Sequence, residues 1–393
     1  MRSGWDNAST VITTRTGPHS NHYHFDQGSF QIMTNGEELL TDPGIGTGGY
    51  YMNTEFLSYN TQSIAHNVLL VDHDPGSQIA AHFDNGLRSL SDWPTMSAPF
   101  NGQSVDAVTA SLATVYKGKL DSYERKLVYR KNGPVFLWDR VTARKDETHV
   151  YDWLFHVPQM QPQRTCSYEN NRFLLEQPKA RLTIDFVYPS GLAASIRDRN
   201  GNTSSYLNYN SKTFSESFLT LSTVKALPAA DFLAVMMPEP LTGTPLAPLP
   251  ATESLSGEGW IGARCKRGDE EDIAYCRTGA DRQQPLNGLQ TDARFLLLSK
   301  TADAQTCFFE GKQLQTDHWH LVADKDVSLA ATSRANSRQI EVETKAPATL
   351  RVEISGKLLA VRVNGKAVKT TVKDGWLTIP AAAGKTTVNY ETK

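Results

Sequence analysis

The sequence of 393 residues lacks several features that would place a protein in a class at once. It has no run of 18 consecutive apolar residues, so no transmembrane helix is predicted. Its first residues lack the apolar segment of a signal peptide. Charge of one sign is not in excess, because 40 Lys and Arg residues nearly balance 42 Asp and Glu residues. Nucleic acid is therefore not an expected partner.

Cysteine is also scarce, and the four cysteines form no C-x-x-C pair. They are Cys166, Cys265, Cys276 and Cys307. One disulfide, between Cys265 and Cys276, is one interpretation, and free buried thiols are the other. Cysteine usage therefore leaves the cellular compartment open.

No window of useful length shows an apolar stripe with the 3.6-residue period of a helix. The chain instead consists of short apolar runs separated by turn signals. Asn-Gly or Asp-Gly between such runs is a strong signal for a β-hairpin. It occurs at Asn35-Gly36, Asn132-Gly133, Asn364-Gly365 and Asp374-Gly375. We therefore predict an all-β protein with antiparallel strands and little helix.

Two changes of composition indicate joints in the chain. The stretch 238–250 contains five prolines, which are incompatible with a central strand and indicate a loop that crosses between strands or sheets. After His320 the sequence changes to six short, alternating strands, enough for a small sandwich. We place a domain boundary near residue 325 and predict domains at 1–325 and 326–393.

The stretch 21–30, with the sequence N-H-Y-H-F-D-Q-G-S-F, contains the densest group of potential ligands. If it forms a strand, His22, His24 and Asp26 share one face, because side chains alternate between the faces of a sheet. Zinc accepts His nitrogen and Asp oxygen together. A pair of hydrogen-bonded histidines at a sheet edge is the alternative, since spacing alone does not place further ligands.

Three motifs in order resemble the β-domain of the heparinase II/III family of polysaccharide lyases, which includes alginate and oligoalginate lyases. They are N-H-Y-H-F-D-Q-G-S-F, then L-L-T-D-P-G, then S-I-A-H-N-V-L-L-V-D, all between Gly17 and Asp72. The resemblance implies a large antiparallel two-layer β-sandwich followed by a small C-terminal β-sandwich. It also implies a periplasmic or secreted protein.

The resemblance further implies a structural zinc ion. In such proteins the second histidine of H-x-H, the aspartate of the D-P-G turn and the histidine of A-H-N bind the metal. These positions are His24, Asp42 and His66 in this sequence. We expect zinc here to fix the wall of the cleft rather than to act as a Lewis acid, although an open fourth coordination position would leave catalysis as the alternative.

The catalytic and substrate-binding residues implied by the resemblance lie beside this metal set. The first histidine of H-x-H, His22, is expected at the substrate cleft and is the predicted catalytic residue. A tyrosine between the D-P-G and A-H-N motifs faces the sugar in such proteins. Tyr51 is the first choice, with Tyr50 as the neighbouring candidate.

The implied reaction is β-elimination at a uronic acid of an acidic polysaccharide or oligosaccharide. The family's lyases precede this β-region with a helical toroid that supplies the other wall of the cleft. This sequence begins about twenty residues before H-x-H, so we expect such a toroid to be missing or supplied by a separate chain. We therefore expect the chain alone to have little or no lyase activity.

Two other classes of protein compete with this interpretation. A non-catalytic carbohydrate-binding or scaffolding module would use the same sandwich, but it gains nothing from His24, Asp42 and His66 together. A cupin-like metal enzyme also places H-x-H on a strand. It would need a glutamate a few residues later, and Glu37 and Glu38 lie too far along the chain.

Overall fold

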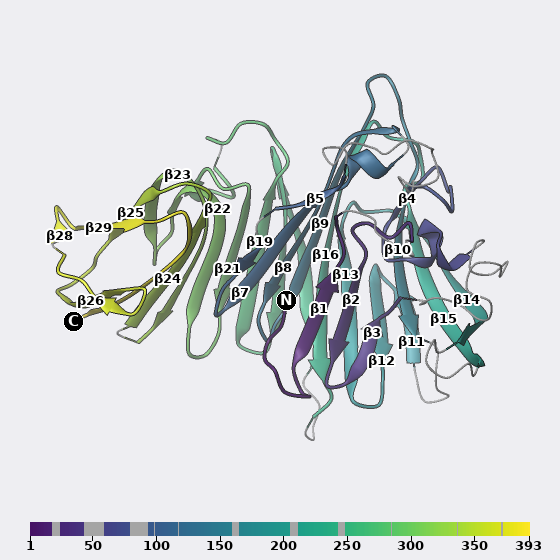
Figure 1. Ribbon diagram of the computed structural model, residues 1–393, viewed down its shortest axis with the longest axis horizontal. Helices are drawn as coiled ribbons and strands as arrows, with labels where there is room; N and C mark the ends of the chain where they lie inside the picture. Colours follow the sequence, from purple (N-terminus) through teal and green to yellow (C-terminus); the bar gives the residue numbers. More distant parts are fainter. Residues whose placement is uncertain are drawn as a thin grey trace. The chain divides into compact units, whose positions relative to one another are not determined.

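The protein is described from a computed structural model (Figure 1). The described residues are 1–17, 24–42, 59–78, 93–97, 99–116, 118–158, 165–204, 211–242, 248–283, 285–335, 337–370 and 372–393. They form two compact units. The first consists of Met1–Pro99 and Ala107–Ala247, and the second of Phe100–Asp106 and Pro248–Lys393.

Three antiparallel sheets build the first unit. The smallest has the order β1-β2-β3, with bounds Thr10–Thr14, Phe30–Thr34 and Glu37–Leu40. The second has the order β14-β15-β10-β4, with bounds Ala193–Ser204, Ser211–Ser222, Tyr151–Pro158 and Leu69–Val71. The third has the order β11-β12-β13-β16-β9-β8-β7-β5. Its bounds are Thr165–Glu169, Arg172–Glu176, Ala180–Tyr188, Ala229–Pro240, Val135–Ala143, Leu120–Arg130, Val105–Ser111 and Thr95–Met96.

One hydrophobic core joins these three sheets. It contains Ile32 of β2, Trp153 of β10 and Leu137 of β9, all buried. Two short 3-10 helices, η2 (Ser63–Ala65) and η4 (Ala113–Val115), lie in the connections. The sheets therefore pack face to face as a sandwich, and the predicted all-β antiparallel fold is confirmed.

A 14-stranded antiparallel sheet makes up the second unit. Its main path is β17-β18-β19-β21-β22-β23-β24-β30-β26-β27, and β20, β25, β28 and β29 pair beside it. The bounds in chain order are Ala251–Gly257, Trp260–Arg267, Glu270–Arg277, Gln290–Thr291, Phe295–Lys300, Gln305–Gln315, His320–Arg334, Ser337–Thr344, Ala348–Glu353, Leu358–Val363, Lys366–Ala367, Val372–Lys373, Trp376–Ala381 and Gly384–Thr392. One core contains side chains from β18 through β30, so the sheet folds back onto itself.

The hairpin turns follow the sequence signals. Asn35 and Gly36 join β2 to β3 with φ values of 53° and 75°. Two positive φ values are what a tight type I′ turn requires, and Asn-Gly adopts them at low cost. The turns at Asn364-Gly365 and Asp374-Gly375 have the same signs of φ. Local sequence therefore determines these strand pairings.

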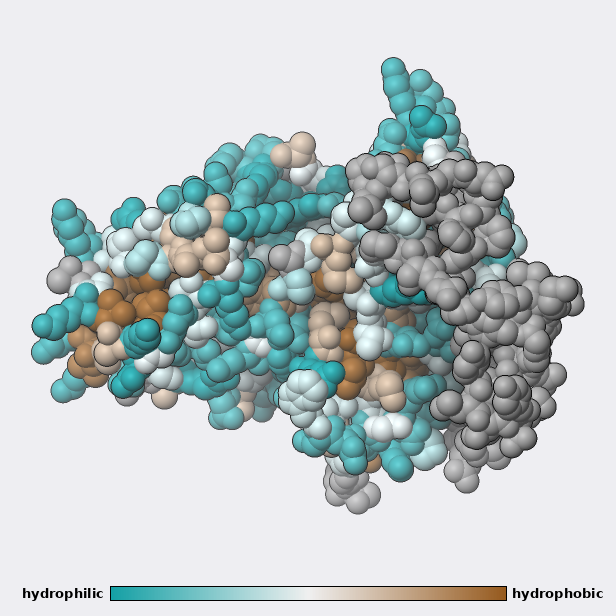
Figure 2. Space-filling view, in the orientation of Figure 1, coloured by the Kyte–Doolittle hydropathy of each residue, from teal (hydrophilic) through white to brown (hydrophobic). Residues whose placement is uncertain are grey.

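Strand alternation explains the surface as well as the core. β25 alternates buried and exposed residues along its whole length. In Figure 2, hydrophilic residues cover much of the coloured surface, and hydrophobic residues show between them. The polar side chains of the strands therefore point outward.

β10 is the exception, because all eight of its residues are buried. Tyr151, Trp153 and Phe155 point into the hydrophobic core. Asp152 and His156 point the other way and form hydrogen bonds with residues of segment 59–78. This buried strand anchors the segment that contains His66.

The two units divide at a different place from the predicted domain boundary. The proline-rich stretch 238–250 contains the division between the units at 247/248, whereas residue 325 lies inside β23. Separate domains at 1–325 and 326–393 stay a prediction.

All four cysteines are free thiols, so the disulfide alternative is not formed. Among the described residues, no helix has the length and apolar character needed to cross a membrane.

Candidate metal centre

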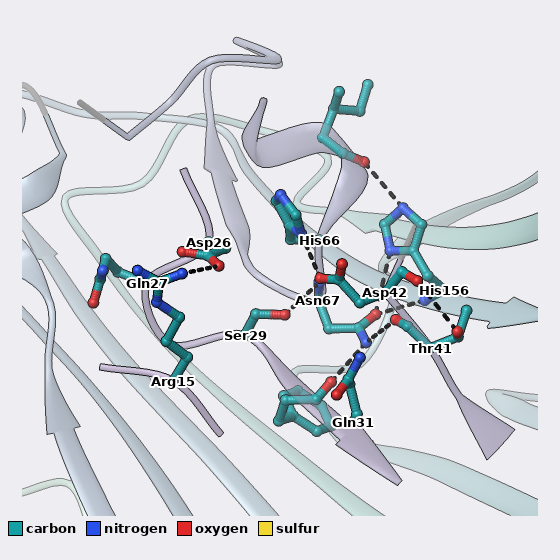
Figure 3. A network of polar contacts seen from close by, with 12 residues as sticks. Arg15, Asp26, Gln27, Ser29, Gln31, Thr41, Asp42, His66, Asn67 and His156 are labelled. Carbon is teal, nitrogen blue, oxygen red and sulfur yellow. Dashed lines mark hydrogen bonds and ion pairs between the residues drawn. The ribbon is translucent and has the colours of Figure 1, made fainter. Parts of the chain in front are cut away.

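Three separate segments of the first unit bring His24, Asp42 and His66 together. His24 precedes β2, Asp42 lies two residues after β3, and His66 directly follows η2. One ligand atom from each residue can be chosen so that all three lie within 4.8 Å of one another. Asp42 Oδ2 lies 2.7 Å from His66 Nδ1, and the rings of His24 and His66 are 5.2 Å apart. Figure 3 shows Asp42 and His66 facing each other.

Burial and charge set the protonation of the two imidazoles. Burial, with the nearby His66 and Arg15, lowers the pKa of His24 to about 4 against the opposing effect of Asp42. Burial also disfavours the charged form of His66, but Asp42 and Asp26 raise the pKa of His66 above its ordinary value. At neutral pH the ring of His24 is therefore uncharged, whereas the protonated, cationic form of His66 is favoured beside Asp42.

Asp26 adds a second carboxylate beside the cluster. Arg15 Nη1 donates to Asp26 Oδ2 at 3.0 Å. Burial raises the pKa of Asp26, and Asp42 adds to that effect, while His66 and Arg15 oppose it. Asp26 Oδ1 and His66 Nε2 are buried and have no hydrogen-bond partner among the described residues. Unsatisfied buried polar atoms are rare in native proteins, and a cation held beside these two atoms would satisfy both.

The donor set fits a zinc ion. Two imidazole nitrogens and one carboxylate oxygen match the ligands that zinc takes in proteins. Bonds of about 2.0–2.2 Å at tetrahedral angles separate neighbouring ligand atoms by about 3.3 Å. The observed separations of 2.7 Å and at most 4.8 Å bracket that value, so small side-chain shifts would suffice.

The side chain of Asn67 links the segments that contain His24, Asp42 and His66 through hydrogen bonds. Its Nδ2 donates to the backbone carbonyls of Phe30 at 2.7 Å and Thr41 at 3.0 Å. Its Oδ1 accepts from the backbone N–H of His156 at 2.6 Å. His156 Nε2 donates in turn to the carbonyl of Ile64 at 3.0 Å. Dashed lines in Figure 3 mark hydrogen bonds of Asn67 with its neighbours.

Arg125 supports the same region from the core. It lies on β8 opposite Asp139 of β9, and the two form a bidentate ion pair with almost no solvent exposure. Arg125 Nη1 also donates to the backbone carbonyls of Gly28 at 2.8 Å and Asn67 at 2.5 Å. Burial opposes the charge on Arg125, but Asp139 raises its pKa, so the guanidinium stays charged.

The structure locates only part of the predicted site. It brings together His24, Asp42 and His66, whereas His22, Tyr50 and Tyr51 lie outside the described residues. Sequence reasoning missed Arg125. The available signal was a pair of opposite charges, Arg125 and Asp139, at the two sides of the Asn132-Gly133 hairpin.

Comparisons with known proteins agree with this architecture. Residues 3–223, more than half of the chain, match the family model described as heparinase II/III-like, C-terminal. No curated protein sequence matches the chain.

Among solved structures, the chain is similar to heparan sulfate lyase HepC from Pedobacter heparinus, with 14% identity and a TM-score of 0.54 over 71% of this chain and 41% of that one. It is similar to a chondroitin AC lyase from Streptomyces coelicolor, with 12% identity and a TM-score of 0.54 over 98% of this chain and 47% of that one. A xanthan lyase from Paenibacillus matches with 10% identity and a TM-score of 0.50 over 98% of this chain and 36% of that one. At these identities the likeness concerns the fold alone, and the chain spans less than half of each structure.

Proposed function

The chain belongs to the heparinase II/III-like family of polysaccharide lyases, and we propose that it forms the zinc-binding β-sandwich part of a lyase for uronic acid-containing glycans. The observation that supports this proposal best is the convergence of His24, Asp42 and His66 from three segments. A non-catalytic binding module would not need two buried imidazoles and a carboxylate at such short distances. The substrate class is proposed from the family, whose structural relatives act on heparan sulfate and chondroitin.

The proposed metal is a structural zinc held by His24, Asp42 and His66. When bound, it would supply a positive charge that neutralises the Asp42 carboxylate and links three loops. The buried His66 Nε2 without a hydrogen bond and the lowered pKa of His24 support this assignment. Zinc in this role holds the cleft wall in place, as Asn67 and Arg125 do from behind it.

The proposed chemistry is β-elimination. A base takes the proton at C5 of the uronic acid, the bond from C4 to the glycosidic oxygen breaks, and a C4–C5 double bond forms. The leaving oxygen takes a proton from an acid. The C5 proton is weakly acidic while the neighbouring carboxylate keeps its full charge, so donors aimed at that carboxylate lower the barrier.

We assign the reacting groups to His22 and to Tyr51 or Tyr50. His22 would donate to the substrate carboxylate or transfer one of the two protons, and a tyrosine would transfer the other. His22 is two residues before His24, so a zinc ion at His24 would restrain the backbone next to His22. We further propose that a helical domain, on the same or another polypeptide, completes the cleft, and that the protein acts in the periplasm or outside the cell.

Glycan binding tests this function. The zinc-loaded chain is titrated calorimetrically with hexasaccharides from heparan sulfate, hyaluronan and alginate. We expect binding to at least one of them, weakened about tenfold or more by His22→Ala through loss of a charge-assisted contact. A folded, zinc-loaded chain that binds none of the three contradicts the proposal. Release of products without the C4–C5 double bond contradicts the lyase chemistry.

A further inference from the structure

The second unit has a polar cavity on the outward face of its sheet, within its own strands β23, β24, β30 and β26. Its volume is about 220 Å³. The strand register places Thr332, Gln339, Asn389 and Arg362 in one cross-strand row, with Arg334 and Ser337 in the next. Cross-strand partners share a face of the sheet, so these side chains meet over one patch.

Positive charge dominates this cavity. Three arginines, Arg334, Arg338 and Arg362, line it together with a single acidic residue, Glu391. None of the three arginines forms an ion pair with a carboxylate anywhere in the described parts of the chain. Other arginines of the same unit are neutralised in ion pairs, namely Arg264 with Glu253, Arg267 with Glu270 and Arg282 with Asp326. The cavity therefore holds guanidinium groups whose charge is left for a ligand.

Backbone contacts hold two of these guanidinium groups. Arg338 Nη1 donates to the carbonyl of Ala335 at 3.0 Å, and Arg362 Nη1 donates to the carbonyl of Gly365 at 3.4 Å. Each contact restricts the side chain and leaves several of its five N–H donors unused. A guanidinium with free donors binds a carboxylate or a sulfate through paired hydrogen bonds.

The other residues that line the cavity indicate which class of anionic ligand it binds. The amides of Gln339 and Asn389 can donate to and accept from the hydroxyls of a sugar. Stacking on aromatic rings is the usual way to bind bases of nucleic acid, and the aromatic lining residue, Tyr390, is 5% exposed. A cavity of about 220 Å³ is smaller than the roughly 300–1,000 Å³ of drug-sized sites, so it fits one sugar residue of a chain.

We propose that this cavity binds one anionic sugar residue, through its carboxylate or sulfate ester, within an acidic glycan chain. It is a binding site in its own right in the second unit and uses none of the residues of the metal centre. Its existence does not depend on the proposed lyase chemistry. Its role is to hold the glycan by a second point of attachment.

The test uses the full chain with His22→Ala as the background, so that the proposed cleft does not contribute. A heparin hexasaccharide of defined size is titrated calorimetrically at low ionic strength. Arg334→Gln combined with Arg362→Gln should weaken binding about tenfold or more, because each removes a charge-assisted hydrogen bond. The matched control combines Lys366→Gln with Lys373→Gln, two exposed residues outside the cavity, and changes the net charge equally. It should leave the affinity within about twofold.

Each other outcome contradicts the proposal. Equal weakening in the two double variants would mean that binding follows net charge and not the cavity. If the His22→Ala chain does not bind the hexasaccharide, the cavity is not a glycan-binding site. Displacement by an equal concentration of inorganic sulfate, or of a single-stranded oligonucleotide, would show that the cavity does not recognise the sugar. Thermal unfolding of each variant checks that the exposed substitutions leave the unit folded.

Discussion

Single residues at the metal centre have separate roles. In the proposed zinc site, His24 and His66 would supply nitrogens and Asp42 the carboxylate. The Asn67 side chain forms hydrogen bonds with the backbones of Phe30 and Thr41 in the neighbouring segments and with that of His156. The Asn67 side chain is fully buried, so no water replaces those bonds when it is removed. The precision of the ligand set therefore depends on a residue that is not itself a ligand.

Asn67→Ala should weaken zinc binding by about 10–100-fold, the range found when groups that orient metal ligands are removed. The carbonyls of Phe30 and Thr41 would lose their donor, and the segment of Asp42 would no longer be tied to that of His66. Zinc affinity is measured by competition with a chelator of known affinity. Thr13→Ala is the control, because its hydrogen bond to Gln31 is exposed. Unchanged zinc affinity in Asn67→Ala would contradict this role.

The lowered pKa of His24 predicts a pH dependence of the metal-free protein. Its pKa is about 4 in the folded state and 6.5 in the unfolded chain. Between these values the unfolded state binds more protons, so the free energy of unfolding rises with pH across that window. His24→Gln should remove this contribution. Urea unfolding with a chelator present measures the free energy of unfolding of the wild type and of the variant. The difference between the two should change between pH 4 and pH 6.5. A difference that does not depend on pH in this window would mean that the pKa of His24 is not lowered.

Among the strands, the hairpins were predictable from the sequence, whereas hydrogen bonds between residues distant in the sequence were not. The Asn-Gly and Asp-Gly turns encode strand pairing within a few residues, and the structure has hairpins at Asn35-Gly36 and Asn364-Gly365. The order of the three motifs also predicted that His24, Asp42 and His66 converge. By contrast, Arg125 contacts Gly28 across 97 positions of sequence, and no local pattern contains that contact.

The β8–β9 hairpin offers a test of this support. Arg125→Met would leave Asp139 buried without its cation, and breaking a buried pair costs about 3–5 kcal/mol. The carbonyls of Gly28 and Asn67 would also lose a donor, so zinc affinity should fall too. Denaturant unfolding measures the stability. A loss below about 1 kcal/mol, the upper range of exposed pairs, would contradict the role of Arg125.

A matched control lies on another hairpin of the same sheet. Arg172 of β12 forms a bidentate pair with Asp185, its cross-strand partner on β13, but its side chain is 29% exposed. Arg172→Met should lower the free energy of unfolding by about 1 kcal/mol, because water solvates the Asp185 carboxylate that remains. Zinc affinity should be unchanged, since it is Arg125 and not Arg172 that donates to the carbonyls of Gly28 and Asn67 near the proposed ligands. A comparable loss of zinc in both variants would point to general destabilisation.

At the scale of the whole molecule, two units have distinct tasks in our account. The first contains the proposed zinc site and most of the residues that match the family. The second contains the arginine-lined cavity. Fold class followed from turn signals and alternation, and family membership followed from about sixty residues of motif. The substrate was not predictable in detail, because the residues that select sulfation or uronate type belong to loops and to elements outside the motif.

The zinc content of the purified chain shows whether His24, Asp42 and His66 bind a metal ion. Elemental analysis should find one zinc ion per chain in the wild type and in His22→Ala. It should find almost none in His24→Ala, Asp42→Ala and His66→Ala, each checked for folding by circular dichroism. A wild-type chain that is fully folded and free of metal, even after incubation with zinc and gel filtration, would contradict the account.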